Sequence, residues 1–326
     1  MAPPKIILGS GVWGYFVDED EIRRHLAEAA KCGILEIDSG AHHPYSKPGL
    51  AETLLGETEY QELGFIVDSK ALFTNGGDGC LTAEAVKSSI NTTLASLKTQ
   101  KLNIYYALAP DRVTPLEEQV TAFDTQYRLG KFAKLGLCNL QPEMLEEWNK
   151  AAGDKGCVKP SVFEGQYNLL CRGYEEAMFP LLRSHGISFY AFGGLAGGIL
   201  TGKLTFSRGA DDLKGTRFEV SDTNVIGAFL RNCYDKPCFH DAVRRIETLC
   251  EAHGIPIADA ALRWLMHHSL LDGDKGDGVI IGPRNMQQLK QNIEACQDGP
   301  LPPDLAEGLA GVFDGVKDEA AKILVY

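Results

Sequence analysis

Residues 134–163, KLGLCNLQPEMLEEWNKAAGDKGCVKPSVF, hold the pattern that decides the fold. Two short apolar runs, residues 134–138 and 160–163, flank a helical stretch in which Pro142 stands near the first helical position. Nearly continuous apolar runs on either side of a helix are typical of parallel strands that are buried on both faces. The stretch therefore predicts a strand, a helix and a second strand parallel to the first.

The same unit recurs along the whole chain. The expected strands are residues 5–8, 34–38, 64–69, 103–107, 134–138, 160–163, 187–191 and 278–281. Helical patterns lie between them, such as the one that runs from acidic Asp20 to basic Lys31, an order that suits the helix dipole. Eight such units without a linker predict a (β/α)8 TIM barrel, a single domain over residues 1–326, with an open doubly wound sheet as the alternative.

Two segments do not fit a plain strand and helix unit. Residues 205–237 are polar and rich in Gly and Asp, and they are too long for an ordinary connection. We expect a long functional loop there, over the catalytic face or partly disordered. Residues 300–326 carry a Pro-bounded helical signal, which predicts a C-terminal helical tail that closes over one end of the domain.

Composition and charge exclude several classes of protein. With 44% hydrophobic and 23% charged residues, the chain can build a large core and is not disordered as a whole. The net charge of -12, from 32 Lys and Arg against 44 Asp and Glu, repels phosphate backbones and anionic lipids. We therefore expect a small-molecule substrate and neither nucleic acid nor a membrane as partner.

The N-terminal residues and the cysteines bear on location. The first residues lack the pattern of a signal peptide, and no apolar run is long enough to cross a membrane. The cysteines number nine, an odd count, without a CxxC pair or zinc spacing, which favours reduced thiols. We expect a cytoplasmic protein that is a monomer or a homodimer.

Several polar residues stand at the ends of expected strands, where a barrel places its active site. Asp38 ends the second strand, Lys70 follows the third, Asn139 follows the fifth, and Gln166 comes soon after the sixth. An acid and a lysine that converge there can form an ion pair in which Asp38 orients Lys70 and tunes a proton donor. A purely structural salt bridge is the alternative.

Adjacent histidines follow Asp38. His42 and His43 could ligate a metal, but the spacing suggests no third ligand, so we expect no metal site. A role of His43 as an acid or a base is the stronger hypothesis.

Two further segments suit phosphate groups. The glycine-dense stretch 193–203, GGLAGGILTGK, offers free N–H groups and a lysine to a diphosphate, although tight turns alone could explain it. Gly197 to Lys203 has the spacing of a nucleotide triphosphatase loop, but Leu204 replaces its hydroxyl residue. Arg284 stands where a strand turns into a helix, which favours an anion, with an ordinary exposed arginine as the alternative.

Stretches spread over the whole chain carry a family resemblance. They are residues 36–39 (EIDS), 48–56 (PGLAETLLG), 67–70 (VDSK), 109–118 (APDRVTPLEE), 136–139 (GLCN), 164–168 (EGQYN) and 195–203 (LAGGILTGK). Together they resemble the aldo-keto reductase superfamily, in particular its aflatoxin aldehyde reductases and their filamentous-fungal relatives. The resemblance implies a (β/α)8 barrel that binds NADPH across its C-terminal face and passes hydride to a carbonyl group.

The resemblance also implies which residues bind the cofactor. Asn139 and Gln166 match the residues that hold the nicotinamide amide. Phe192 takes the place of the stacking tyrosine, and Gly193 that of a serine. The remaining matches are Leu195, Gly197 and Lys203 at the diphosphate, and Arg284, Gln288 and Asn292 at the adenosine and 2'-phosphate end.

The catalytic residues match the family only in part. The family uses an Asp, a Tyr five residues later, a Lys and a His. Asp38 and Lys70 match, but His43 stands at the Tyr position, with Tyr45 nearby, and Leu108 stands at the His position. Loss of one positioned proton donor or oxyanion donor typically costs ~10² to 10⁴ in rate.

These departures leave the function open between hypotheses. The first is an atypical NADPH-dependent reductase of a C=O, C=N or conjugated C=C bond in a bulky apolar substrate of specialised metabolism. His43 or Tyr45 would donate the proton, and Trp13 and Leu108 would shape the substrate pocket. The second is a non-redox cyclase, isomerase or dehydratase that uses His43 as acid or base. The third is a catalytically silent subunit that senses the nucleotide.

Overall fold

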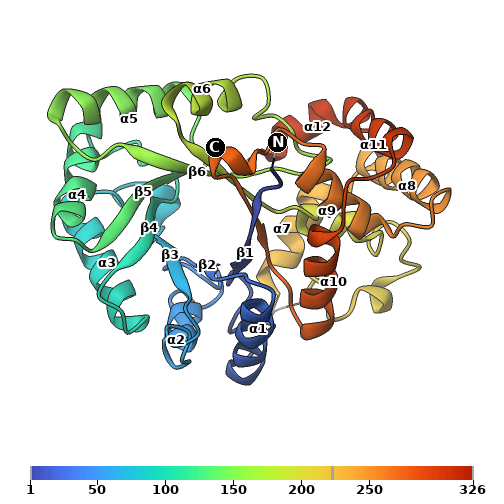
Figure 1. Cartoon of the computed structure of the whole chain (residues 1–326), viewed down its shortest axis with the longest axis horizontal. Coiled ribbons are helices and arrows are strands. Elements are labelled where there is room, and N and C mark those ends of the chain that lie inside the picture. Colours follow the sequence, from blue (N-terminus) through green and yellow to red (C-terminus); the bar gives the residue numbers. More distant parts are fainter. Residues whose placement is uncertain (1, 222–223, 325–326) are drawn as a thin grey trace.

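Parallel strands form the centre of the molecule. In the computed structural model, which describes residues 2–221 and 224–324, eight parallel strands pair in sequence order and close into a barrel. The strands are β1 (Lys5–Gly9), β2 (Glu36–Asp38), β3 (Ile66–Lys70), β4 (Leu102–Ala107), β5 (Phe132–Cys138), β6 (Pro160–Gln166), β7 (Ser188–Phe192) and β8 (Gly278–Ile281). Figure 1 shows them at the centre, with the helices around them. The predicted single-domain (β/α)8 barrel is confirmed.

All the expected strands are found, and β6 differs most from its prediction. It runs to Gln166, whereas the apolar run predicted an end at Phe163. The added residues include Glu164 and Gln166, whose polar side chains do not look like a buried strand. Inside a closed barrel, however, polar side chains from facing strands can satisfy one another. The strand therefore continues where the apolar pattern stops.

Helices follow most strands and cover the outside of the barrel. Several begin as the sequence predicts: Thr82 accepts a hydrogen bond from the backbone N–H of Ala85 at 3.2 Å, and Pro142 is the first residue of its helix. The α-helices are α1 (Glu19–Lys31), α2 (Leu50–Gly56), α3 (Ala83–Ser96), α4 (Leu116–Arg128), α5 (Pro142–Lys155), α6 (Met178–His185), α7 (Val225–Tyr234), α8 (Pro237–Glu251), α9 (Ile257–His267), α10 (Met286–Gln297), α11 (Pro303–Ala310) and α12 (Lys317–Ile323).

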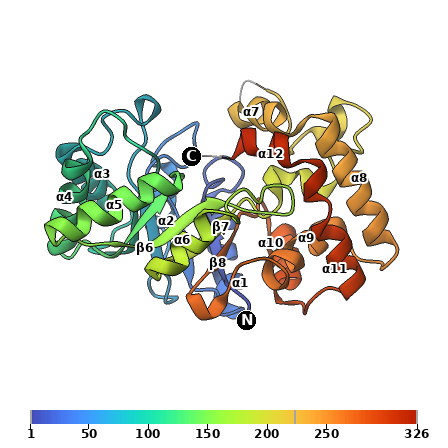
Figure 2. The ribbon, with the colours of Figure 1, turned by 90° about the horizontal axis from the view of Figure 1, so that it is seen from above.

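The segment expected as a long loop, residues 205–237, is partly helical. It contains the short 3-10 helix Ala210–Leu213 and α7, while residues 222–223 lie outside the described residues. The Asn224 side chain accepts from the backbone N–H of Gly227 at 3.1 Å and donates to the carbonyl of Glu219 at 2.7 Å. Figure 2 places α7 and the N-terminus at opposite sides of the molecule. The segment therefore lies at the end of the barrel where the strands finish.

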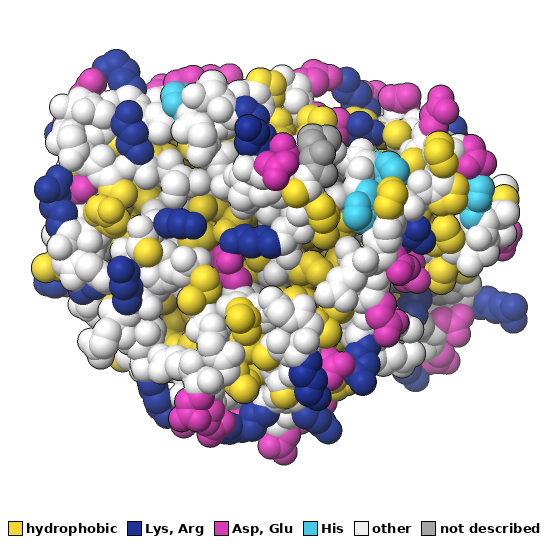
Figure 3. Space-filling model, viewed as in Figure 1, with side chains coloured by type: hydrophobic (Ala, Val, Ile, Leu, Met, Phe, Trp, Pro, Cys, Tyr) yellow, Lys and Arg dark blue, Asp and Glu magenta, His cyan; other side chains and the backbone are white. Residues whose placement is uncertain are grey.

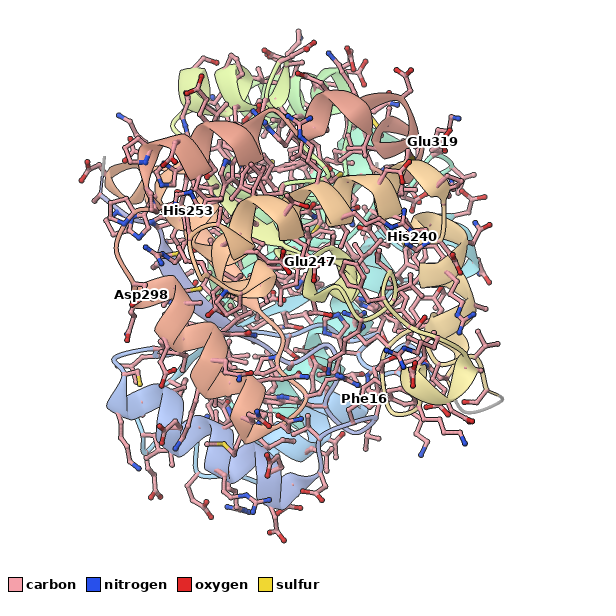
Figure 4. All side chains as sticks on the ribbon, turned by 90° about the vertical axis from the view of Figure 1, so that its right-hand side faces the viewer. Phe16, His240, Glu247, His253, Asp298 and Glu319 are labelled. Atoms are coloured by element: carbon pink, nitrogen blue, oxygen red, sulfur yellow. The ribbon has the colours of Figure 1, made fainter. Side chains whose placement is uncertain are left out.

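The C-terminal tail packs on α8. In the range expected as the tail, residues 300–326, the structure describes α11 and α12 but not residues 325–326. Leu305 and Leu309 of α11 are buried, and α11 packs against α8. Lys236, just before α8, pairs with Glu319 of α12 at 2.9 Å, and Figure 4 shows Glu319 close to the start of α8.

The hydropathy of the helices, the surface and the cysteines complete the description. Within residues 2–221 and 224–324, no helix is both long enough and apolar enough to span a membrane. Figure 3 shows one face, on which acidic and basic side chains alternate around the edge and hydrophobic side chains lie toward the middle. All nine cysteines belong to the described part of the chain and are free thiols.

The main core lies between the strands and the helices, and a smaller apolar cluster fills the barrel interior. The interior cluster consists of Ile7, Ile104, Tyr106, Val162, Tyr190 and Ile280. Tyr106 on β4 fits there because its neighbour on β5 is Gly136, with which it is in register. A Cβ atom on Gly136 would lie 2.1 Å from the Tyr106 ring, so any larger residue would displace this ring.

We expect Gly136→Ala to lower the free energy of unfolding by about 1–3 kcal/mol, because overpacking forces a buried ring off its position. Gly299→Ala is the matched control, since Gly299 is exposed and an added Cβ would meet nothing within 4 Å. Urea unfolding followed by circular dichroism measures both variants. Equal stability of the two would contradict the packing argument.

Candidate active site

A cleft of about 540 Å³ lies at the ends of the barrel strands. Asp38, Lys70 and Cys138 are the last residues of β2, β3 and β5, and Glu164 and Phe192 lie near the ends of β6 and β7. Alternate residues of a barrel strand point inward, so side chains from separate strands converge on the same space. The cleft is therefore built by the closure of the barrel.

Most of the residues predicted from the sequence line this cleft. Those that do are Asp38, His43, Tyr45, Lys70, Leu108, Asn139, Phe192, Gly193, Leu195, Gly197, Lys203, Arg284, Gln288 and Asn292. Trp13 and Gln166 are not part of the lining in the described structure. Trp13 is fully buried in the main core, and the Gln166 amide donates to the Tyr234 hydroxyl at 2.7 Å. Because of this burial and this hydrogen bond, neither side chain reaches the cleft that the sequence predicted it would line.

Lys70 forms the predicted ion pair with Asp38 at the floor of the cleft. Its ammonium donates to the Asp38 carboxylate and, at 2.9 Å, to the backbone carbonyl of Ser39, and it lies 3.1 Å from Oε2 of Glu164. Burial lowers the pKa of Lys70, but the carboxyl groups of Asp38 and Glu164 outweigh this effect and raise the pKa above its ordinary value. Lys70 is therefore a permanent cation.

Glu164 is the main residue that the sequence reasoning missed. It is 4% exposed, and burial followed by the neighbouring Asp38 charge raises its pKa to about 8, against the opposing effect of Lys70. Its carboxyl group therefore keeps its proton at neutral pH. Strand alternation from Val162 would have placed Glu164 inside the barrel, but the predicted strand ended one residue earlier.

His43 lies beside the ion pair as a neutral imidazole. A Cβ atom on Gly11 would come within 3.7 Å of its ring, and its ring centroid is 4.3 Å from that of His42. Burial lowers the pKa of His43 well below its ordinary value, and the nearby groups His42 and Lys70 lower it further. A neutral imidazole can donate one N–H hydrogen bond or accept a proton, but it holds no extra proton to give.

Tyr45, the other predicted proton donor, lies at the mouth of the cleft. Its side chain is 62% exposed, and its ring centroid is 6.5 Å from that of His42. In the described structure, Lys70 donates its hydrogen bonds to Asp38 and to the Ser39 carbonyl, and to neither His43 nor Tyr45. The assignment of the proton donor to His43 or Tyr45 therefore stays a prediction.

Asn139 presents an unused acceptor to the cleft. Its side-chain N–H group donates to the Leu108 carbonyl at 2.9 Å. Its oxygen Oδ1 is buried and, within the described residues, has no hydrogen-bond partner. A buried acceptor without a partner is costly, and an amide N–H of a ligand would satisfy it. The apolar Leu108 side chain lines the cleft beside it.

The glycine-rich stretch forms the opposite wall. It contains the 3-10 helix Ala196–Thr201, and Gly193 and Gly197 have left-handed φ angles of 70° and 68°. Gly197 is also close to Leu230, which would lie 2.8 Å from an added Cβ atom. Glycine is required at both positions because other residues adopt this conformation only with strain. Lys203 follows as an exposed cation on the cleft.

Two arginines give the far end of the cleft a positive charge. Arg284 lies in the turn between β8 and α10, donates to the Gly215 carbonyl and sits 5.0 Å above the Phe16 ring. Arg217 lines the same space, and burial, followed by repulsion from Arg284, lowers its pKa. An anion between these guanidinium groups would relieve their repulsion. Nothing in the polar segment around Arg217 distinguishes it in the sequence.

A metal centre has no support in the geometry. Among residues 2–221 and 224–324, no group of three or more His, Cys, Asp and Glu side chains is arranged to hold a metal ion.

We expect the His43 ring to stay neutral through pH ~6.5, the ordinary histidine pKa, because burial lowers its own pKa well below that value. The unfolded chain takes up a proton near pH ~6.5 and the folded chain does not, so folding stability falls as the pH drops below that value, by up to about 1.4 kcal/mol per unit. NMR titration of the ring signals, assigned by their loss in His43→Gln, measures the protonation. A titration midpoint at or above pH ~6.5 would contradict the expectation.

Comparisons with known proteins agree with this geometry. The sequence pattern of the aldo/keto reductase family matches residues 5–310. An aldo-keto reductase of Pseudocercospora fijiensis is 34% identical, over 89% of this chain and 97% of that protein. The oxidoreductase sirO of Leptosphaeria maculans is 34% identical, over 83% and 80%. Human aflatoxin B1 aldehyde reductase member 2 is 33% identical, over 94% and 86%.

The family match spans nearly the whole barrel, and the Lys70–Asp38 pair and the glycine-rich wall lie on one cleft within it. The chain therefore belongs to the aldo/keto reductase family of oxidoreductases.

Proposed function

We propose that the protein is an atypical NADPH-dependent reductase of a C=O, C=N or conjugated C=C bond in a bulky apolar substrate. The observation that carries the proposal is that a single cleft joins the buried Lys70–Asp38 pair to an anion-binding end with Lys203, Arg217 and Arg284. The Lys70–Asp38 pair can polarise a reacting double bond, and the cations at the other end can bind phosphate groups.

The residues of the cleft fit NADPH. The free Oδ1 of Asn139 can accept a hydrogen bond from the nicotinamide amide, and the left-handed glycines leave room for a diphosphate. Phe192 offers a ring face on the same cleft. Arg284, with Gln288 and Asn292, would bind the adenosine and 2'-phosphate end. When bound, NADPH would supply hydride to the substrate.

The remaining side chains can orient and polarise the substrate. The Lys70 cation, held by Asp38, stabilises negative charge that develops on a carbonyl oxygen. The neutral His43 ring can donate an N–H hydrogen bond to that oxygen. Leu108 and Phe218 give the cleft apolar surface, which supports a bulky apolar substrate. Gln166 is not part of this proposal, because its amide is engaged with Tyr234.

The cellular location, the metabolic role and the oligomeric state are also proposals. We propose a cytoplasmic enzyme of specialised metabolism that acts as a monomer or homodimer. The free state of all nine cysteines supports a reducing compartment. The fungal relatives, an aldo-keto reductase and the oxidoreductase sirO, support a role in a fungal pathway.

We expect nucleotide-free protein to bind NADPH with a micromolar or tighter Kd, because cations and an unpaired amide acceptor line the cleft. Calorimetric titration measures the binding, and deuteride-labelled NADPH then tests for label in the product. Substrate turnover in protein stripped of nucleotide would instead favour the non-redox cyclase, isomerase or dehydratase. NADPH binding without turnover of any substrate would favour a nucleotide-sensing subunit.

We expect Arg284→Met to weaken NADPH binding by about 1.5–3 kcal/mol, roughly 10- to 150-fold, because a charge-assisted contact to the 2'-phosphate is lost. NADH lacks that phosphate, so its affinity should change little. Lys290→Met is the control for loss of a nearby positive charge, since Lys290 is exposed on α10 outside the cleft lining. Equal losses for NADPH and NADH would show that Arg284 does not recognise the 2'-phosphate.

A further inference from the structure

We infer that the Glu164–Asp38 carboxyl pair is the proton donor of the cleft, with Glu164 giving the proton that a tyrosine gives elsewhere in the family. The inference rests on the proposed reductase function and assigns a catalytic residue to it. Glu164 replaces His43 and Tyr45 in that role.

The donors of Lys70 are directed away from both of those candidates. An ammonium group has three N–H donors. In the described structure, Lys70 contacts the Asp38 carboxylate, the Ser39 carbonyl at 2.9 Å and the Glu164 carboxyl at 3.1 Å. These contacts account for its donors, so Lys70 donates no hydrogen bond to the hydroxyl of Tyr45 or to a ring nitrogen of His43. Its third contact is instead with Glu164.

Charge balance requires a proton on the carboxyl pair. Asp38 and Glu164 are both buried at the cleft floor, where they face the single cation of Lys70. Two carboxylates beside one ammonium would bury an unpaired negative charge, which is strongly unfavourable. Consistent with this, the neighbouring Asp38 charge adds to burial in raising the pKa of Glu164. Like-charged carboxyl groups in one site share a proton for this reason.

The proton resides on Glu164 rather than on Asp38. Asp38 makes the close contact with the Lys70 ammonium, whereas Glu164 lies farther away at 3.1 Å. Tyr106 on β4 and Cys138 on β5 also face the pair, and burial raises the pKa of both, so both are neutral. The raised pKa of Glu164, about 8, agrees with a carboxyl that is protonated at neutral pH.

Glu164 is also placed where a donor must be. Its side chain belongs to the cleft lining together with Asp38 and Lys70. Its Oε2 atom is buried, lies 3.1 Å from the Lys70 ammonium and has no other hydrogen-bond partner within residues 2–221 and 224–324. A protonated carboxyl group on the cleft lining can meet a substrate oxygen in the same space.

The chemical step balances with this donor. A bound reduced nicotinamide would supply hydride to the carbonyl carbon and be oxidised, and the C=O bond would become a C–O single bond. The O–H bond of Glu164 breaks, and its proton forms the new O–H bond of the alcohol. The carboxylate that remains is stabilised by Lys70 and is reprotonated from water after the product leaves.

A second carboxyl pair deeper in the barrel provides a matched control. Burial, followed by the neighbouring Glu36 on β2, raises the pKa of Asp68 on β3, and Glu36 pairs with Lys5 at 2.5 Å. This pair repeats the arrangement of two carboxyl groups and one lysine, but Asp68 is absent from the cleft lining of the described structure. Asp68→Asn can keep the hydrogen bonds that its Oδ1 accepts from Asn103 and Ile104. It therefore removes a buried carboxyl away from the substrate.

The first test compares Glu164→Gln with Asp68→Asn. With NADPH and 4-nitrobenzaldehyde as the probe, we expect Glu164→Gln to lower kcat by ~10² to 10⁴, while calorimetry shows that NADPH still binds. Wild-type kcat should fall above about pH 8 as Glu164 loses its proton, and Asp68→Asn should keep the wild-type kcat and pH profile. A Glu164→Gln variant with wild-type kcat, or with a defect only in NADPH binding, would overturn the assignment.

The second test needs neither substrate nor nucleotide. Infrared difference spectroscopy between low and high pH detects the carbonyl stretch of a protonated carboxyl group. We expect a band that titrates near pH 8 in the wild type and in Asp68→Asn but is missing in Glu164→Gln. Identical spectra of Glu164→Gln and wild type would overturn the inference. Wild-type protein that shows the band but binds no NADPH would contradict the proposed function alone.

Discussion

The contact of one buried ammonium group with its oxygen partners organises the active end of the barrel. Lys70 of β3 joins the Asp38 carboxylate of β2, the Ser39 carbonyl and the Glu164 carboxyl of β6. Because β6 lies across the barrel from the neighbouring strands β2 and β3, these contacts join β6 to strands with which it does not pair. A buried charge tolerates little displacement of its partners. The ion pair is thus both a structural tie and a preorganised electrostatic site.

The polar interior of this barrel depends on close packing as well as on charge. Below the Lys70 cluster, the Tyr106 ring fills the space that Gly136 leaves open, and the ammonium of Lys70 lies 5.3 Å from the centroid of that ring. The apolar rings exclude water, which strengthens the ionic contacts and makes an unpaired charge more costly. A second lysine, Lys5, balances the deeper acids Glu36 and Asp68. Each of the two carboxyl pairs in the barrel is therefore accompanied by a lysine.

The departures from the family pattern form one consistent arrangement. The sequence resemblance places His43 at the family's tyrosine position and Leu108 at its histidine position. Leu108 makes that side of the cleft apolar, and burial, aided by the nearby His42 and Lys70, keeps the His43 imidazole neutral. Together with the burial of Glu164, these changes move the available proton from the loop after β2 to strand β6. The proposed anion-binding end of the same cleft is lined by Lys203 and Arg284, which the resemblance matches to the family's cofactor site.

The sequence by itself determined the repeat of strand and helix, and with it the barrel, because apolar runs and helix caps act locally. It also indicated Asp38, Lys70 and the glycine wall, since strand ends and left-handed glycines leave local marks. Only the tertiary structure decided that Glu164 and Arg217 line the cleft while Trp13 and Gln166 do not. The physical reason is that neighbours across a closed barrel depend on register and burial, which no local pattern records.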